Sequence, residues 1–194
     1  MKNRYVITGL GQVSLLGNSI EEMKISLRNQ NINFNISSSE SKSGLVATIN
    51  DFDFYQHGFK TKTYTDRASQ LCIYAVKQVS NCLQETREDD KRIGLITASL
   101  FGCLDSAEKY LHQLKTLKKA RFASPLYFTH SICNIPNSIS TIECQLSGFS
   151  NHLVGSSDSG LMTLWQAIQC LEANQASCII AGGFDALSEE LMKS

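Results

Sequence analysis

The chain has 194 residues, of which 42% are hydrophobic and 19% are charged. This is the composition of one soluble globular domain, and it excludes a disordered or fibrous protein. Eighteen Lys and Arg residues balance eighteen Asp and Glu residues, so no net field draws the whole chain to nucleic acid or to an anionic membrane, and a charged partner must meet a local patch.

The seven cysteines form no Cys-x-x-Cys pair. Each lies in or near an apolar segment, as small buried hydrophobic residues do, which predicts free thiols in a reducing compartment such as the cytoplasm. The four histidines have no helical i,i+4 partner, so neither a metal site nor another cofactor is predicted. The apolar runs are too short to cross a bilayer, and the N-terminus lacks a signal-peptide core.

Residues 5–11 form a β-rich run closed by glycines, which predicts a buried strand entering a tight turn. Asn18 and Ser19 offer an N-cap for a helix that reaches about Arg28. The Asn- and Ser-rich stretch 29–42 predicts a surface loop, which short strands could flank. An amphipathic pattern from Thr65 or Asp66 to about Gln84 predicts a helix of about five turns.

The second half of the chain continues the alternation of strands and helices. Residues 92–97 predict a strand and residues 104–119 a helix, whose basic end at Lys115, Lys118, Lys119 and Arg121 complements the helix dipole. The apolar-polar stretch over residues 124–146 is broken by Pro136 and is expected to be a loop followed by a helix, and a strand, a turn and a helix are expected over residues 152–171. Residues 177–183 predict a closing strand. This order favours one α/β domain over residues 1–194, with a largely parallel or mixed sheet.

Five segments, in chain order, resemble the β-ketoacyl synthase family, the thiolase-fold condensing enzymes of fatty-acid and polyketide synthesis. The resemblance covers nearly the whole chain, and matches in this order are far more specific than any one of them. It implies a thiolase-like half, a layered α/β structure with a mixed, mostly parallel five-stranded sheet and helices on both faces. The segments are residues 6–17, 66–71, 124–136, 147–152 and 181–188.

The resemblance also locates the position of the family's nucleophile. The nucleophilic cysteine of the family lies two residues before a Ser-Gly at the start of a helix, and here Ser159 and Gly160 assign that position to Ser157. A helix N-terminus stabilises a thiolate, whereas a serine hydroxyl has a far higher pKa and needs a positioned base. Asp158 adds a negative charge that opposes an anion beside it. We therefore expect Ser157 to be inactive in thioester chemistry.

The length of the chain is the second departure from the family. Condensing enzymes of the family have two related halves, and the histidine pair that assists decarboxylation comes from the second. The present chain resembles the first half only. His130 and His152 match no catalytic histidine of the family, so we expect them to be structural or surface residues.

The resemblance further suggests an acyl pocket and a patch for a carrier protein. Leu100 and Phe101 stand where the family has a Gly-rich turn, and they could shape an acyl tunnel or pack as ordinary core. Phe128 and Asn134 lie in the segment that lines the family's acyl pocket. The basic residues Lys60, Lys62 and Arg67 occur where the family's positive patch meets the acidic acyl carrier protein, or they form a solvated basic face.

The resemblance therefore implies a non-catalytic, cytoplasmic ketosynthase-like subunit, similar to chain-length factors. Such a subunit pairs with an active β-ketoacyl synthase, or with a second copy, in fatty-acid or polyketide biosynthesis, and it meets an acyl carrier protein. Two alternatives stay open. Ser157 could accept or hydrolyse an acyl group, as in a transferase or thioesterase, or the chain could be one piece of a split synthase. No nucleic acid or membrane partner is expected.

Overall fold

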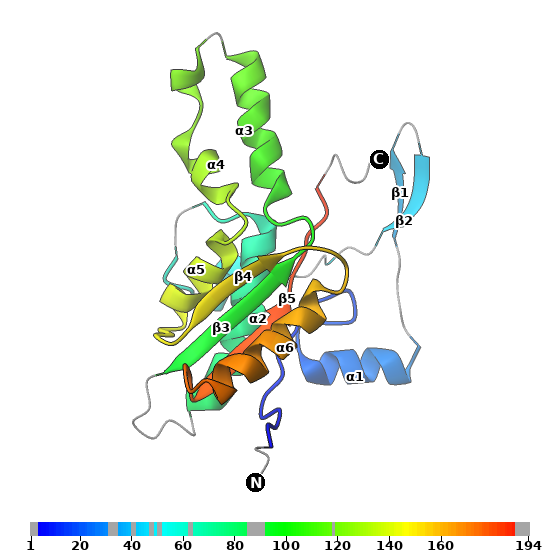
Figure 1. The fold of residues 1–194 in the computed structure, drawn as a ribbon. Coiled ribbons are helices and arrows are strands. Elements are labelled where there is room, and N and C mark those ends of the chain that lie inside the picture. The colour runs from blue at the N-terminus through cyan, green and yellow to red at the C-terminus, as the bar shows by residue number, and fades with distance from the viewer. Residues whose placement is uncertain are drawn as a thin grey trace.

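The computed structural model describes residues 4–30, 35–39, 42–46, 49, 52–61, 64–84, 92–117 and 119–188. Six α-helices and five strands lie in these ranges, and Figure 1 shows their arrangement. The helices are α1 (Ile20–Arg28), α2 (Arg67–Gln84), α3 (Leu104–Thr116), α4 (Pro125–His130), α5 (Ile135–Glu143) and α6 (Ser159–Glu172). The strands are β1 (Asn35–Ser39), β2 (Lys42–Val46), β3 (Ile93–Ser99), β4 (Ser150–Val154) and β5 (Cys178–Gly183). Two short 3-10 turns, η1 (Phe54–His57) and η2 (Ala120–Phe122), complete the set.

The centre of the fold is a parallel sheet in the order β4-β3-β5. All seven residues of β3 are buried, because helices cover both faces of the sheet. Leu95 packs with Cys72 and Val76 of α2 on one face, whereas Ile96 packs with Ala167 and Cys170 of α6 on the other. This alternation is the period-2 pattern of a strand buried on both sides. Figure 1 shows α6 in front of the sheet and α2 behind it.

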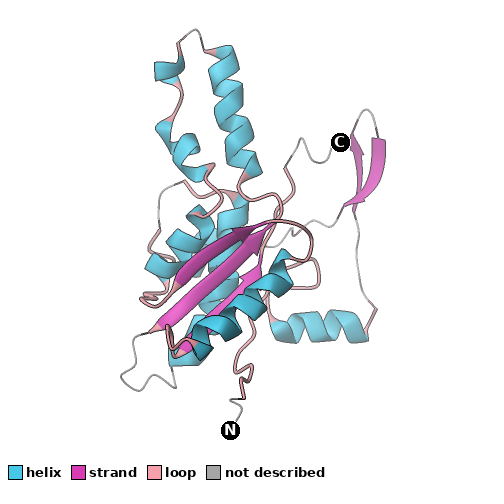
Figure 2. Ribbon diagram, viewed as in Figure 1, coloured by secondary structure: helices cyan, strands magenta, loops and turns pink. Residues whose placement is uncertain are grey.

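The prediction of an α/β layer with helices on both faces is confirmed, but the predicted five-stranded sheet is wrong. Among the described residues the central sheet has three strands. Strands β1 and β2 pair with each other in a separate antiparallel sheet, within and just beyond the stretch predicted as a loop (Figure 2). Within the described residues the two sheets share no ladder, because β1 pairs with β2 and β3 pairs with β4 and β5.

The predicted strand over residues 5–11 is also absent from the described sheets. Val6 and Ile7 are 79% and 76% exposed, and the segment lies against α2 instead. There a Cβ on Gly11 would lie 2.3 Å from the carbonyl oxygen of Ala75. A β-rich composition forms a strand only where a neighbouring strand supplies ladder hydrogen bonds, and the described residues supply none here.

Several helix predictions are confirmed by their caps. Ser19 is the N-cap of α1, where its hydroxyl accepts from the Glu22 backbone N–H and the Glu22 carboxylate accepts from the Asn18 N–H at 2.7 Å. Asp66 accepts from the Ser69 N–H at 2.8 Å before α2. Pro136 lies in the first turn of α5, where a missing N–H costs nothing, so it marks the start of the helix predicted after the loop.

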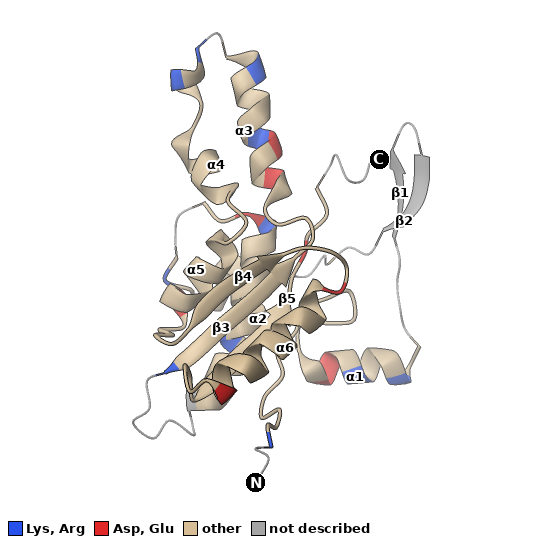
Figure 3. Cartoon of the chain, in the orientation of Figure 1, with Lys and Arg blue, Asp and Glu red and all other residues tan. Residues whose placement is uncertain are grey.

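Helices α3 and α4 form a hairpin that extends away from the sheet (Figure 1). The predicted helix ends at Thr116, and the exposed residues Lys115, Lys119 and Arg121 lie at the far end of the hairpin. Figure 3 shows these blue residues apart from the acidic ones. Lys118 lies outside the described residues. The chain is neutral as a whole, but its charge is unevenly distributed, because no Asp or Glu occurs between Glu108 and Glu143.

Candidate functional site

The candidate site lies at the carboxyl ends of the three parallel strands, which meet at one edge of the sheet. Ligands bind at this edge in open α/β sheets. Two backbone hydrogen bonds tie the loops there to each other. Phe184 N, just after β5, donates to the carbonyl oxygen of Ala98 at 2.9 Å, and Gly155 N, just after β4, donates to that of Ser99 at 3.4 Å. The loops after β3, β4 and β5 therefore form one surface.

Ser157 is exposed in the loop after β4, directly before α6. Asp158 is at the N-cap position of α6, but its side chain makes no cap hydrogen bond and instead accepts from the hydroxyl of Ser156. A helix N-terminus carries partial positive charge that would stabilise an anion. Because the carboxylate of Asp158 already lies there, the position next to it is poorly suited to a nucleophilic oxyanion.

His152 has both ring nitrogens occupied. Nδ1 lies 2.8 Å from Thr97 Oγ1 and Nε2 lies 3.1 Å from Ser99 Oγ, and the ring stacks on Phe184. Burial lowers the pKa of His152, and the charge of Asp185 opposes that shift. The imidazole therefore links β3 to β4, and its described hydrogen bonds go to Thr97 and Ser99 rather than to Ser157.

The other histidines lie elsewhere. His130 is 5% exposed at the end of α4, with its Nδ1 buried and without a hydrogen-bond partner in the described structure, and burial lowers its pKa. His57 stacks on Phe52, and His112 is exposed on α3. Among the residues that the structure describes, no histidine is hydrogen-bonded to Ser157. A serine without such a base is a weak nucleophile.

The four residues predicted for an acyl pocket are all exposed. Leu100 and Phe101 are 41% and 40% exposed in the loop after β3, so neither packs as ordinary core. Phe128 is on α4, where its ring lies 5.4 Å from that of Tyr110, and Asn134 directly precedes α5. The structure thus divides the predicted set between the edge of the sheet and the neighbouring helices.

The residues predicted for a carrier-protein patch differ in what they contact. Arg67 is turned inward, where its guanidinium donates to the carbonyl oxygens of Phe52 and Ile49 at 3.2 and 3.0 Å, and burial lowers its pKa. Lys60 is exposed, and Lys62 lies outside the described residues. Of the three residues predicted for the carrier-protein patch, Lys60 is thus the one whose side chain faces solvent in the described structure.

Glu143 is a buried carboxylate that sequence reasoning missed. It is 5% exposed at the end of α5, and it accepts from Lys60 N at 2.9 Å, from Thr61 N at 3.1 Å and from Thr61 Oγ1 at 3.0 Å. Three donors satisfy the charge and fix the loop that presents Lys60. One sequence feature could have drawn attention to Glu143, because it is the one charged residue between Arg121 and Asp158.

Helix α6 presents its large apolar residues outward. Small residues face the sheet, including the buried Thr163 and Ala167, while Leu161 is 70% and Trp165 56% exposed. Four of the exposed apolar residues follow helical spacing and are called here the α6 stripe: Leu161, Leu164, Trp165 and Ile168. Met162, also exposed, lies beside this stripe in sequence. Figure 3 shows α6 free of charged residues until its last turn. A contiguous exposed apolar stripe is typical of a surface that another protein layer covers.

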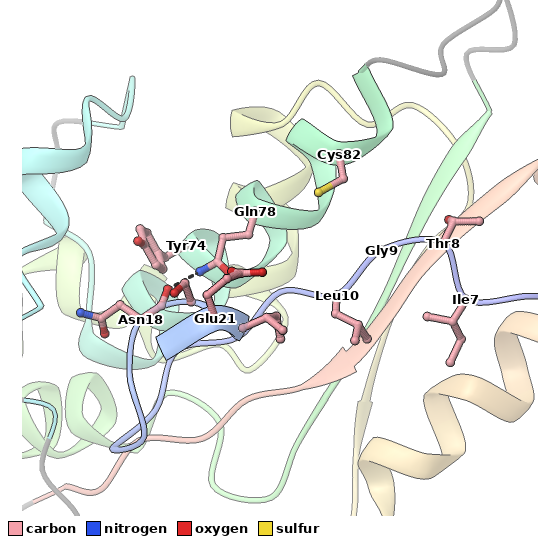
Figure 4. A pocket seen from close by; sticks show the side chains of 11 residues that line it. Ile7, Thr8, Gly9, Leu10, Asn18, Glu21, Tyr74, Gln78 and Cys82 are labelled. Carbon is pink, nitrogen blue, oxygen red and sulfur yellow. Dashed lines mark hydrogen bonds between the residues drawn. The ribbon is translucent and has the colours of Figure 1, made fainter. Parts of the chain in front are cut away.

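A cavity of about 540 Å³ lies apart from this site, between the N-terminal segment, α1 and α2 (Figure 4). Gln78 supports its wall, because the Gln78 amide donates to the carbonyl oxygens of Gln12 and Asn18 at 2.9 and 2.8 Å. The lining mixes apolar side chains such as Leu10 with the thiol of Cys82. No sequence signal indicated this cavity.

The described part of the chain has neither a cluster of metal-ligating side chains nor a helix that could span a membrane. No group of three or more His, Cys, Asp or Glu side chains there is placed to hold a metal ion. None of the described helices is long and apolar enough to cross a membrane. All seven cysteines are free, as predicted.

The architecture is that of a ketosynthase half. It superimposes on the ishigamide ketosynthase/chain length factor with a TM-score of 0.83 at 21% identity, covering 94% of this chain and 53% of that one. A type II polyketide synthase acyl-carrier protein in complex with its ketosynthase gives a TM-score of 0.79 at 20% identity, over 97% of this chain and 52% of that one.

Sequence comparison identifies the family. Residues 3–192 match the model of the β-ketoacyl synthase N-terminal domain, and the chain belongs to this family. The 3-oxoacyl-[acyl-carrier-protein] synthase 2 of Coxiella burnetii is 27% identical over 197 residues, which cover 98% of this chain and 47% of that protein. The chain thus spans about half the length of the curated relatives that it matches, as the resemblance implied.

Proposed function

We propose that this chain is a ketosynthase-like subunit without thioester chemistry of its own, which pairs with an active β-ketoacyl synthase in fatty-acid or polyketide biosynthesis. The observation that carries the proposal is Ser157, followed by Asp158, at the position where the family has its nucleophilic cysteine. A chain-length factor is the kind of subunit that this pattern resembles.

The chemistry of the site supports a non-catalytic role. Acyl transfer to Ser157 would form an ester C–O bond and break a thioester C–S bond, and the serine proton would have to pass to a base. The nearest candidate by sequence, His152, is committed to Thr97 and Ser99. Asp158 would also repel the developing negative charge on the attacked carbonyl oxygen.

The α6 stripe supports a partner. Large apolar residues on the outward face of a helix gain free energy when a second layer of protein covers them. One structural neighbour is described as a ketosynthase/chain length factor and another as an acyl-carrier protein in complex with its ketosynthase. By analogy, the partners proposed here are a ketosynthase, or a second copy of this chain, and an acyl carrier protein that Lys60 contacts. A cytoplasmic location, in keeping with the free thiols, is part of the proposal.

Co-expression with a cysteine-bearing β-ketoacyl synthase from the same source tests this function. We expect the two chains to purify together, and we expect the lengths of the acyl products to change when this chain is omitted. A chain that stays a stable monomer and leaves the product profile of the synthase unchanged would overturn the proposal.

One observation favours a second candidate function. Ser157 is exposed at the start of a helix, which is where an acyl-accepting serine would stand in a transferase or thioesterase. Incubation with acyl-carrier thioesters followed by peptide mass spectrometry separates the two functions, because only this candidate predicts an acyl adduct on Ser157. A split synthase predicts instead that condensation appears when a separate second-half chain is added.

A further inference from the structure

The loop after β3 is held by a carboxylate that the site described above does not use. Asp185 lies two residues beyond β5, and both of its oxygens accept from Leu100 N at 3.1 Å. One of them also accepts from Phe101 N at 2.8 Å. Two successive backbone N–H groups thus donate to one carboxylate. Such a pair of donors binds an anion well, and the bound carboxylate in turn fixes the backbone of the loop.

The neighbouring backbone explains how Asp185 reaches this loop. The β3–β5 ladder pairs Ala98 with Gly183, and Phe184 N extends it by donating to the carbonyl oxygen of Ala98. The loop then turns at Gly102, whose φ of +59° is in the left-handed region that favours glycine. The ladder and the turn bracket the two amides that Asp185 binds.

The side chains of this loop have few other restraints. Leu100 and Phe101 are 41% and 40% exposed, so packing in the core does not fix them. On the side of β4, the loop is joined by the long bond from Gly155 N to the carbonyl oxygen of Ser99. The position of both apolar side chains therefore depends mainly on the backbone that Asp185 holds.

We infer that Asp185 is a positioning residue, which fixes Leu100 and Phe101 where they limit the space for an acyl chain and so sets product length in the complex. The inference rests on the proposed function, because it needs a partner synthase whose products this chain influences. Asp185 does not touch the acyl group. It acts through the backbone amides of residues 100 and 101.

Hydrogen exchange of the isolated chain tests the first step. In Asp185→Ala, we expect the amides of Leu100 and Phe101 to exchange at least about 10-fold faster than in the wild type, because a local opening now breaks fewer bonds. The amides of Ile96 and Ala98 should keep their wild-type rates. Asp185→Asn retains an acceptor without the charge and should give an intermediate rate. Glu172→Gln, which removes an exposed charge from the end of α6, is the matched control and should have no effect.

Product analysis of the complete complex, with its synthase, its acyl carrier protein and thioester substrates, tests the second step. A defined hydrophobic pocket discriminates a single methylene by about 10-fold or more, so a loosened loop should raise the share of products of other lengths severalfold. Leu100→Ala and Phe101→Ala should change the distribution likewise, whereas Glu172→Gln should not.

The outcomes separate the anchoring role of Asp185 from its role in product length. Faster exchange with a changed distribution supports the inference. Unchanged exchange in Asp185→Ala overturns the anchoring role, and faster exchange with unchanged products overturns the role in product length while the proposed function stands. If omission of the whole chain leaves the products unchanged, the proposed function fails and the role in product length fails with it, even where the exchange result holds.

Discussion

Helices α2 and α6 cover opposite faces of the same parallel sheet, yet they distribute their apolar residues in opposite ways. Helix α2 buries its large side chains, with Leu71 8% and Ile73 0% exposed. Helix α6 buries small residues and leaves Leu161 and Trp165 exposed. The α2 side is thus a finished hydrophobic core, whereas the α6 side has the composition of a core without its second layer. The difference indicates that stability and association depend on different faces of one sheet.

The largest expected effect is on the α2 side. Ile73→Ala should lower the free energy of unfolding by about 3 kcal/mol, because it removes buried methyl groups and leaves a cavity. Leu161→Ala in the α6 stripe should change it by less than about 0.5 kcal/mol in the isolated chain. Urea unfolding followed by circular dichroism measures both. Equal losses for the two variants would contradict the contrast between the helices.

The next effect should appear only in the presence of a partner. Trp165→Ala removes the largest side chain of the α6 stripe, and we expect it to weaken binding to the partner synthase by at least about 30-fold, as for a buried aromatic anchor. Isothermal titration calorimetry gives the affinity. Gln169→Ala, a polar exposed position on the same helix, is the control. An unchanged affinity for Trp165→Ala would assign the interface to another surface.

Glu143 offers a test on the α2 side that involves charge rather than packing. Glu143→Gln weakens acceptors for three donors of the loop at Lys60 and Thr61, and we expect it to cost about 1 to 2 kcal/mol of unfolding free energy. The amides of Lys60 and Thr61 should also exchange faster. Glu172→Gln should leave both quantities unchanged. If Glu143→Gln behaves like this control, the buried carboxylate does not anchor the loop.

The smallest expected effect is on the pH dependence of stability. Burial lowers the pKa of both His130 and His152 in the folded state below the ordinary value of 6.5. The unfolded chain therefore binds more protons, so stability is complete above about pH 6.5 and falls as the pH decreases below it.

His130→Phe isolates one of these contributions. The substitution keeps an aromatic ring next to Tyr64, whose ring is 5.3 Å from that of His130, and it removes a buried Nδ1 that has no described partner. We expect the loss of stability between pH 7 and pH 5 to become shallower in thermal unfolding. The exposed His112→Gln should keep the wild-type slope, and a steeper slope for His130→Phe would contradict the assignment.

The sequence predicted the parts of the fold that depend on local signals. The Ser19 cap and the apolar pattern of α2 fix helices through contacts a few residues apart, so their bounds could be predicted. Residues 5–11 have the composition of a strand, but a strand also needs a neighbour to pair with, and sequence composition does not identify that neighbour. The five strands of the predicted sheet were implied by the resemblance, whereas the described residues pair three strands in the central sheet and two in a separate one.

The site shows the same division between local and long-range information. Ser157 could be located, because the resemblance rests on residues next to it in sequence. The carboxylates of Glu143 and Asp185 bind amides 82 to 85 residues away, and no periodicity or spacing reveals such pairs. Arg67 was assigned to a surface patch from its position in the resemblance, whereas its guanidinium donates to the carbonyl oxygens of Phe52 and Ile49, which the fold brings near.

The most direct test of the central claim is the mass of both chains during turnover of the complex. Thioester substrate should acylate the cysteine of the synthase, and this chain should stay unmodified, because Ser157 lacks a base and lies beside Asp158. The double variant S157C with Asp158→Ala is the positive control for access, since a thiol at a helix N-terminus ionises readily once the neighbouring carboxylate is removed, whereas burial raises the pKa of the native Cys72 thiol to about 12. We expect an acyl adduct at position 157 of this double variant and none on the wild-type chain. An acyl adduct on Ser157 of the wild-type chain would contradict the central claim.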